Sequence, residues 1–206
     1  MTIGRPRLRL ATVVPAHVPA ATITEKLTAA LRGVAPEIAV ISCLIGVPPA
    51  PAADLVIAAT DPNAYRRGAQ RLAALGTDLA LVQHSIGHPG GQHLLGLSNE
   101  LGRRGIPCLV LLNELPLSMR PPDADTVTAL GRAAAGVLVL SDAAARLLAH
   151  QRLVAPDAIA VLAERKPGAG RPSLNASAAL LAGVVHLVVR RTVEREPAPV
   201  RHSGRL

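Results

Sequence analysis

The chain has 206 residues, of which half are apolar and 17% are charged, a composition typical of a folded globular protein rather than a disordered chain. It contains one Tyr and neither Phe nor Trp, so it has almost no rings on which the bases of a single-stranded nucleic acid could stack. The net charge of +8 lies at the two ends: residues 1–10 carry +3, residues 165–206 carry +6, and residues 11–164 carry −1. Because basic tails bind polyanions weakly and without sequence preference, we expect no specific nucleic-acid partner.

Seven short apolar runs alternate along the chain with segments of helical spacing. Consecutive apolar positions in such short runs are typical of parallel strands that are buried on both faces. The alternation predicts an α/β fold, a doubly wound, Rossmann-like parallel sheet in a single domain with a C-terminal helical tail. We expect strands over 8–14, 38–45, 55–59, 79–82, 108–112, 137–140 and 159–162, and helices over 24–31, 64–75, 94–103, 125–135 and 143–151.

The loops after the strands carry the polar residues, and ligands of such sheets bind at the carboxyl ends of the strands. The first loop has no G-x-G-x-x-G, which argues against a dinucleotide there. Ser141 or Asp142 is expected to cap a helix rather than act as a nucleophile, because no G-x-S-x-G surrounds the serine. Asp123 and Asp125 are expected to be acids in the first turn of a helix.

The predicted domain covers residues 7–164, and a Gly- and Pro-rich linker covers 165–172. Residues 173–206 combine an apolar helix over 173–189 with a basic tail, and we expect the helix to pack on the domain or on a partner. A membrane anchor is the alternative, but 17 residues are at the short limit for spanning, and Asn175 and His186 interrupt the stretch.

The cellular setting is predicted to be the cytoplasm. Cys43 and Cys108 each lie inside an apolar run, which indicates buried free thiols rather than a disulfide or a zinc site. Pro15, His17 and Pro19 interrupt the apolar stretch near the N-terminus, so this segment does not form a signal peptide.

A segment over 83–93, QHSIGHPGGQH, contains three histidines and a glycine pair. His84, His88 and His93 could converge on a metal such as zinc, but no Cys or acid nearby completes a ligand set. The simpler interpretation is a loop whose glycines let the backbone approach a ligand or a neighbouring loop closely. Gly90 and Gly91, placed before a helix, could also present backbone amides to an anion.

Several segments resemble those of bacterial family 4 glycosyltransferases, in one order and one register over residues 8–162. VQHSIGHPGG at 82–91 resembles that family's LQHEFGIFGG loop, and IPCLVLLNELPLSMRPP at 106–122 resembles its P-V-V-x-T-x-H-T-V-L-P segment. AGVLVLSDAAARLL at 135–148 is similar to A-D-A-V-V-V-M-S-E-R-A-A-E-L-L. ATVVPAHVPAATITEKL, which begins at residue 11, is similar to STYPPRRCGIATFTEDL.

The resemblance implies the GT-B architecture, in which the N-terminal Rossmann-like domain binds the acceptor and the C-terminal one binds a nucleotide-sugar donor. It implies sugar transfer with retention, with no metal and no cofactor besides that donor. This chain would be the acceptor-side half, truncated and incomplete or inactive alone, with a small-molecule sugar acceptor and a second, donor-binding chain as partners. The resemblance assigns no catalytic residue; it places Gln83, His84, Ser85, Gly87, Gly90, Gly91, Asn113 and Glu114 in the acceptor-side loops, and His17 and Pro19 in the first loop.

The chain departs from this family pattern at several positions. Ser85 stands where the family has Glu, Ile86 and Pro89 stand at aromatic positions, and Asn113 replaces a His. Pro19 replaces the glycine that lets the backbone approach the donor phosphates. These changes favour an alternative, a non-catalytic module on the same fold that binds a ligand or a protein, whereas the retained loop around His84 favours the transferase.

Overall fold

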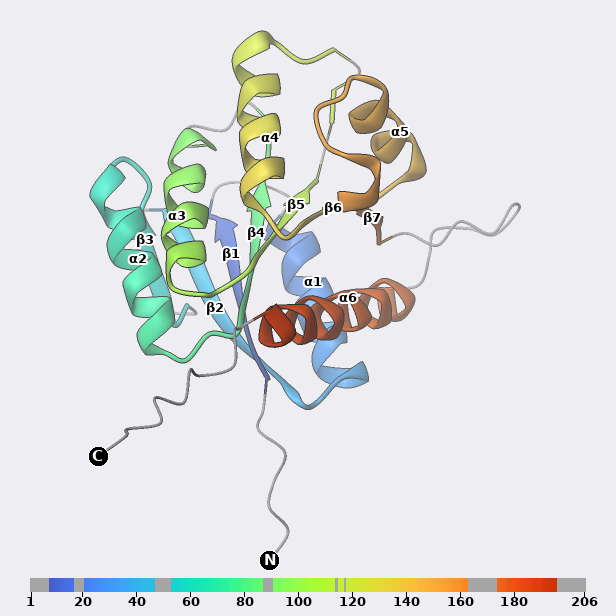
Figure 1. Ribbon diagram of the computed structural model, residues 1–206. Helices are drawn as coiled ribbons and strands as arrows, with labels where there is room; N and C mark the ends of the chain where they lie inside the picture. The colour runs from blue at the N-terminus through green and yellow to red at the C-terminus, as the bar shows by residue number, and fades with distance from the viewer. Residues whose placement is uncertain are drawn as a thin grey trace, which may run out of the picture.

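The order of the strands in the sheet reverses at its centre, between β1 and β4 (Figure 1). A computed structural model describes residues 8–16, 21–46, 53–86, 91–113, 115–116, 118–162 and 174–195. In it, seven parallel strands form one sheet in the order β3-β2-β1-β4-β5-β6-β7. The order reverses between β1 and β4, and in a doubly wound sheet this reversal leaves room for ligands at the carboxyl ends of the strands. The strands are β1 (Leu8–Pro15), β2 (Ile38–Gly46), β3 (Leu55–Ala58), β4 (Leu79–His84), β5 (Cys108–Leu112), β6 (Gly136–Val139) and β7 (Ile159–Val161).

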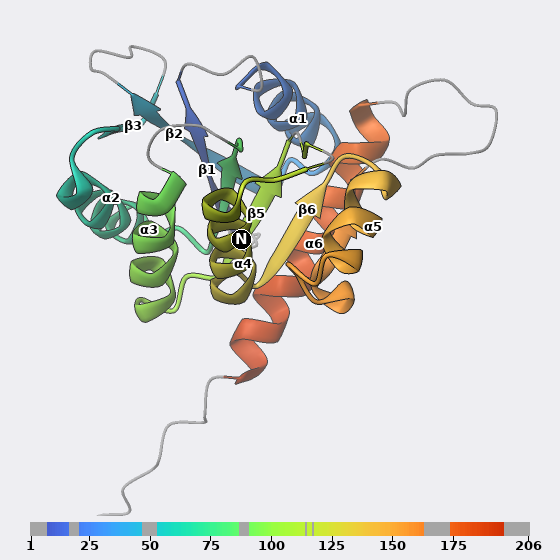
Figure 2. The same cartoon turned by 90° about the horizontal axis from the view of Figure 1, so that it is seen from above.

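Helices cover both faces of the sheet, as predicted (Figure 2). Four of them pack on one face, and α1 and α6 pack on the other. Right-handed crossovers produce this division, because the chain winds outward from β1 in one direction and from β4 in the other. The helices are α1 (Ala21–Val34), α2 (Pro62–Ala74), α3 (Gly91–Arg103), α4 (Pro121–Ala133), α5 (Asp142–His150) and α6 (Leu174–Arg195), with a 3₁₀ turn η1 (Pro156–Ala158).

The residues at the starts of α4 and α5 determine where these two helices begin. Helix α4 begins at Pro121, four residues before the predicted start, because proline fits the first turn, where no helical N–H bond is lost. Asp123 therefore lies in the first turn, where its carboxylate accepts a hydrogen bond from Arg120 Nε at 3.0 Å, whereas Asp125 lies beyond that turn. Ser141 caps α5, and its hydroxyl accepts a hydrogen bond from the Ala144 amide at 3.2 Å.

The core is built from small aliphatic side chains on both faces of the sheet. Along β4, Ala80 and Val82 point toward α2 and α3, while Leu79 and Leu81 point toward α1 and α6. The single tyrosine, Tyr65, is 1% exposed, and its hydroxyl donates a hydrogen bond to the Ala59 carbonyl at 3.1 Å. Aliphatic side chains with a single tyrosine therefore form a buried hydrophobic layer on each face of the sheet.

The two cysteines are buried free thiols, as predicted. Cys43 lies in β2 and Cys108 in β5, and both belong to the hydrophobic layer under α2 to α5. Burial raises the pKa of each thiol to about 12, because a thiolate in this layer would lose its hydration. The Ser98 hydroxyl beside Cys108 opposes this rise only in part.

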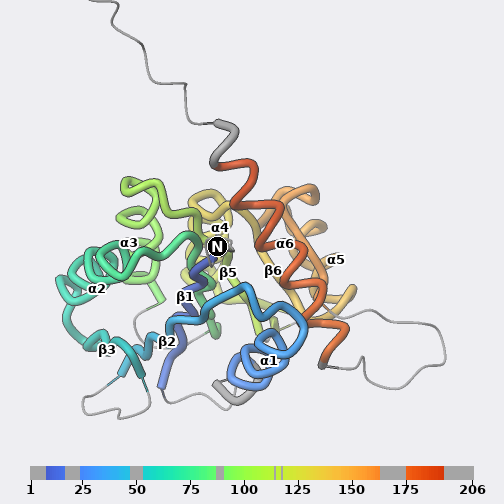
Figure 3. The backbone as a smooth tube through the Cα atoms, turned by 90° about the horizontal axis from the view of Figure 1, so that it is seen from below, coloured from blue at the N-terminus to red at the C-terminus, as the bar shows by residue number. Residues whose placement is uncertain are grey.

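Helix α6 closes the second face of the sheet beside α1 (Figure 3). Its buried residues are spaced as one helical stripe: Ala178, Leu181, Ala182 and Val185. At its side, His186 Nε2 lies 3.1 Å from Glu37 Oε1, which follows α1. The helix predicted over 173–189 is found at Leu174–Arg195, so it continues six residues into the predicted basic tail, and it packs on the domain. The predicted linker over 165–172 lies outside the described residues. None of the described helices combines the length and apolarity that crossing a membrane would require.

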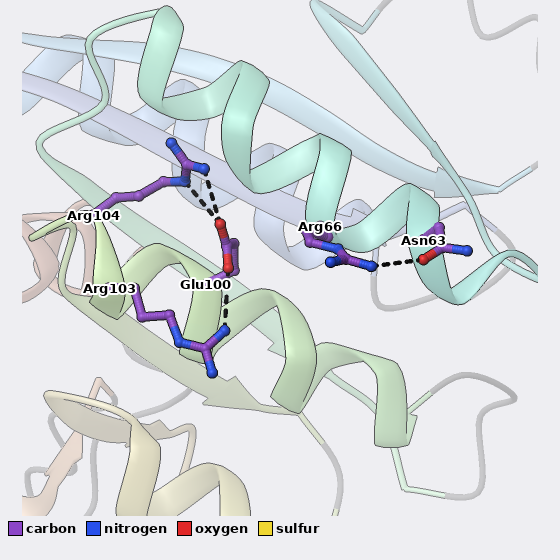
Figure 4. A network of polar contacts seen from close by, with 5 residues as sticks. All are labelled: Asn63, Arg66, Glu100, Arg103 and Arg104. Carbon is purple, nitrogen blue, oxygen red and sulfur yellow. Dashed lines mark hydrogen bonds and ion pairs between the residues drawn. The ribbon is translucent and has the colours of Figure 1, made fainter.

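Two arginine pairs, one on α2 and one at the end of α3, lie on exposed faces of the protein. On α3, Glu100 accepts hydrogen bonds from Arg104 at 2.9 Å and from Arg103 at 3.3 Å (Figure 4). The Arg104 contact is the main reason why the pKa of Glu100 lies below its ordinary value. On α2, Arg66 donates to Asn63 at 2.9 Å. These local contacts need no external anion.

Candidate functional site

Polar side chains occupy the carboxyl end of β4, although the strand is buried there. Gln83 is 0% exposed and His84 is 4% exposed. Side chains alternate along a strand, so Gln83 points to the face covered by α1 and His84 to the face covered by α3. The sheet pairs these two residues with Leu111 and Leu112 of β5, so Asn113 comes next on the neighbouring strand.

The Gln83 amide is only partly satisfied. Its Oε1 atom accepts a hydrogen bond from the hydroxyl of Thr24 on α1, and Thr24 is itself 1% exposed. The Gln83 Nε2 group is buried and has no hydrogen-bond partner among the described residues. A buried donor left in this state costs about 1–3 kcal/mol, so it is seldom retained without a purpose.

His84 is positioned by a glycine. A Cβ atom on Gly91 would lie 2.7 Å from His84 Cε1, so the imidazole rests against the first residue of α3. His93 has a different neighbour, since its ring centroid lies 5.3 Å from that of Tyr65 at an interplanar angle of 47°. Within the described parts of the chain, no three His, Cys, Asp or Glu side chains gather as metal ligands. His88 lies outside them.

Unsatisfied polar atoms gather where β4 and β5 end. Of the five buried side-chain polar atoms without a partner in the described structure, four belong to Gln83, Ser85 and Asn113. Asn113 contributes both its Nδ2 and its Oδ1 atom, and Ser85 contributes its hydroxyl. The fifth is the Ser98 hydroxyl, which lies beside the Cys108 thiol within the core. We call Gln83, Ser85 and Asn113 the edge cluster.

A pocket of about 380 Å³ opens next to Asn113. Its walls come from the ends of β5 and β6 and from one side of α5. The polar lining consists of Asn113, Ser141, Arg146 and His150, and the apolar lining consists of Leu115, Leu140, Ala143, Ala144 and Leu147. We call it the α5 pocket.

A smaller pocket of about 270 Å³ lies between α1 and the strands β1 and β2. Hydroxyl groups dominate its polar lining, and one of them belongs to Thr24, the partner of Gln83. Its lining residues are Thr12, Val14, Thr24, Glu25, Thr28, Arg32, Ser42 and Leu44.

The sequence-predicted site residues fall into two groups. Gln83, His84, Ser85, Gly91 and Asn113 are described, and they lie together at the carboxyl ends of β4 and β5 and the start of α3. The other predicted residues lie outside the described part of the chain: His17, Pro19, Gly87, Gly90 and Glu114.

Sequence reasoning missed Arg146 and His150 and the hydroxyls beside α1. The available signal was the spacing of residues 143, 146, 147 and 150, which places them on one face of a helix. That spacing is the same as the spacing of a core-facing stripe, so periodicity alone does not distinguish a pocket wall from packing.

No family model and no curated protein matches the chain. Among solved structures, it is similar to a UDP-N-acetylglucosamine 2-epimerase, with a TM-score of 0.59 and 16% identity over 82% of this chain and 54% of that one. The chain thus spans about half the length of that structure. It is also similar to a sucrose-phosphate synthase from Thermosynechococcus elongatus, with a TM-score of 0.53 and 11% identity over 87% of this chain and 98% of that one. At such identities the likeness concerns the fold alone, and the chain has the Rossmann-like α/β fold of GT-B-type enzymes.

Proposed function

We propose that the protein is glycosyltransferase-like and binds a small sugar acceptor at the carboxyl ends of β4 and β5. The observation that carries the proposal is the edge cluster, where four buried polar atoms lack partners among the described residues. Amide and hydroxyl groups of this kind are suited to the hydroxyls of a sugar, because each can donate or accept. A bound sugar would supply the hydrogen bonds that the folded chain leaves unmade.

Two further observations support this assignment. The cluster lies beside the reversal of strand order, the place where doubly wound sheets bind their ligands. The two similar structures are named as a UDP-N-acetylglucosamine 2-epimerase and a sucrose-phosphate synthase, and both names concern sugars. In the proposal, this chain supplies the acceptor side of a retaining transferase, and a second chain binds the nucleotide-sugar donor.

The edge cluster suits binding and orientation rather than proton transfer. Gln83 and Asn113 are amides, and Ser85 is a lone hydroxyl, so none of them takes up a proton near neutral pH. Ser85 and Asn113 stand where the family pattern has Glu and His. This chemistry favours, as the second candidate, a sugar-binding module that performs no transfer.

The test relies on the energetic cost of the buried polar atoms that have no hydrogen-bond partner when no ligand is bound. Replacing Asn113 with Leu, which has a similar volume, removes two unpartnered polar atoms. We expect the free energy of unfolding of the ligand-free protein to rise by about 1 kcal/mol, while the affinity for glucose, mannose or N-acetylglucosamine falls at least tenfold. Urea denaturation and isothermal titration calorimetry measure the two effects.

Ser98→Ala is the matched control, because it removes a buried hydroxyl that lies away from the edge cluster, beside the Cys108 thiol. It is expected to leave sugar affinity unchanged. A loss of stability in Asn113→Leu with unchanged sugar binding would show that the amide serves the fold, and the proposal would then fail. Incubation with UDP-glucose and each sugar, analysed by mass spectrometry, is expected to show no transfer by this chain alone, and transfer would contradict the requirement for a second, donor-binding chain.

A further inference from the structure

The lining of the α5 pocket indicates which class of sugar would bind there, and this inference rests on the proposed function. We propose that the bound sugar bears an anionic group, a phosphate or a carboxylate, that is held by Arg146 and His150. The two residues lie one turn apart on α5 and line the same pocket as Asn113. Asn113 of the edge cluster and these two side chains would therefore contact one molecule.

The charge of the pocket has one sign. Arg146 contributes a positive charge, and none of the described residues that line the pocket is Asp or Glu. Asp142 lies one turn before Arg146 on the same helix, the spacing at which ion pairs form, yet the two residues form no ion pair in the described structure. The charge of Arg146 thus has no acidic partner among the described residues, unlike those of Arg103 and Arg104, which share Glu100.

The remaining lining fits the rest of such a ligand. Leu115, Leu140 and Leu147 provide an apolar wall for the C–H face of a sugar ring, and Asn113 offers both a donor and an acceptor for its hydroxyls. The guanidinium of Arg146 can bind a phosphate or a carboxylate through two parallel hydrogen bonds. A volume of about 380 Å³ lies within the range of small-molecule sites.

Calorimetric titration of the full chain with matched sugars tests the inference. The ligands are glucose, mannose and N-acetylglucosamine, their 6-phosphates, glucuronate and inorganic phosphate. We expect at least one anionic sugar to bind ten times more tightly than its neutral counterpart, and the phosphate and carboxylate arms identify the preferred anion. Arg146→Ala is expected to abolish this difference by lowering the affinity for the anionic sugar to that for its neutral counterpart.

Arg132→Ala is the control for general electrostatics, because Arg132 is an exposed arginine near the end of α4 and does not line the α5 pocket. It removes the same charge and is expected to leave the preference intact. Circular dichroism checks that both variants fold. The conservative variant Arg146→Lys is expected to restore part of the preference.

The outcomes separate this inference from the proposed function. If the neutral sugars bind as tightly as their 6-phosphates and glucuronate, the anionic inference is wrong and the proposed function stands. A preference that survives Arg146→Ala, or that Arg132→Ala reduces equally, would also overturn the inference. If none of the sugars binds, the proposed function fails, and the inference fails with it.

Discussion

The absence of one Cβ atom, at Gly91, gives the His84 imidazole its place at the start of α3. A side chain at this position would come within 2.7 Å of the buried ring. We expect Gly91→Ala to displace His84 and to lower the free energy of unfolding by about 1–3 kcal/mol, as overpacking does in other cores. Urea denaturation gives the energy, and the NMR signals of the His84 ring report the displacement.

Gly96 provides the control within the same helix, because a Cβ added there meets nothing within 4 Å. Gly96→Ala is expected to stabilise the protein by about 0.5–1 kcal/mol, since alanine loses less backbone entropy in a helix. If the two substitutions changed stability by the same amount and in the same direction, the contact between Gly91 and His84 would have no energetic importance.

Among the helices, α6 offers a direct test of packing, because two neighbouring leucines on it differ in burial. Leu181 is 1% exposed within the buried stripe, whereas its neighbour Leu180 is 40% exposed. We expect Leu181→Ala to lower the free energy of unfolding by about 2–4 kcal/mol, through lost burial and the cavity that remains. Leu180→Ala, the same chemical change one residue earlier, is expected to cost less than about 1 kcal/mol.

Urea denaturation followed by circular dichroism measures both leucine variants. Similar small losses in the two variants would mean that α6 adds little to the stability of the domain. A loss confined to Leu181→Ala would establish that α6 is an integral part of the hydrophobic core on the α1 face.

For the whole molecule, the two buried thiols link stability to alkaline pH. The pKa of each thiol in the folded protein is about 12, against an ordinary value of 9.0, so the unfolded chain releases these protons first as the pH rises. The contribution of the two protonated thiols to the free energy of unfolding is therefore fully present below pH 9 and is lost between pH 9 and 12. Each thiol is expected to account for a loss of about 1 kcal/mol between pH 9 and pH 10.

Urea denaturation at pH 8, 9 and 10 measures this decline in the native protein and in Cys43→Ala. The variant starts from a lower stability, but its loss between pH 9 and 10 should be smaller by about 1 kcal/mol, the share of one thiol. An identical decline in both proteins would show that Cys43 is not protected by burial. The rise in the pKa of buried Tyr65 adds a similar effect at higher pH, which is why the series stops at 10.

The strands were predictable because a strand buried on both faces needs apolar residues at consecutive positions, as in Cys108–Leu112. The edge-cluster residues were also found from the sequence, through their resemblance to one loop and one strand end. Their decisive property was not predictable, because whether the amide of Asn113 finds a partner depends on elements far away in the chain.

The amino-acid sequence by itself determined the α/β class, the seven strands and the burial of Cys43 and Cys108, because each follows from local spacing or composition. It also predicted a helix cap at Ser141 or Asp142, of which the structure shows Ser141. Only the tertiary structure decided that Gln83 and Asn113 come together with unpartnered atoms and that Arg146 and His150 face the same pocket. It also decided that α6 packs beside α1. The physical reason is that pairing of strands and packing of helices join residues far apart in sequence, whereas local patterns fix only the identity and the facing of each element.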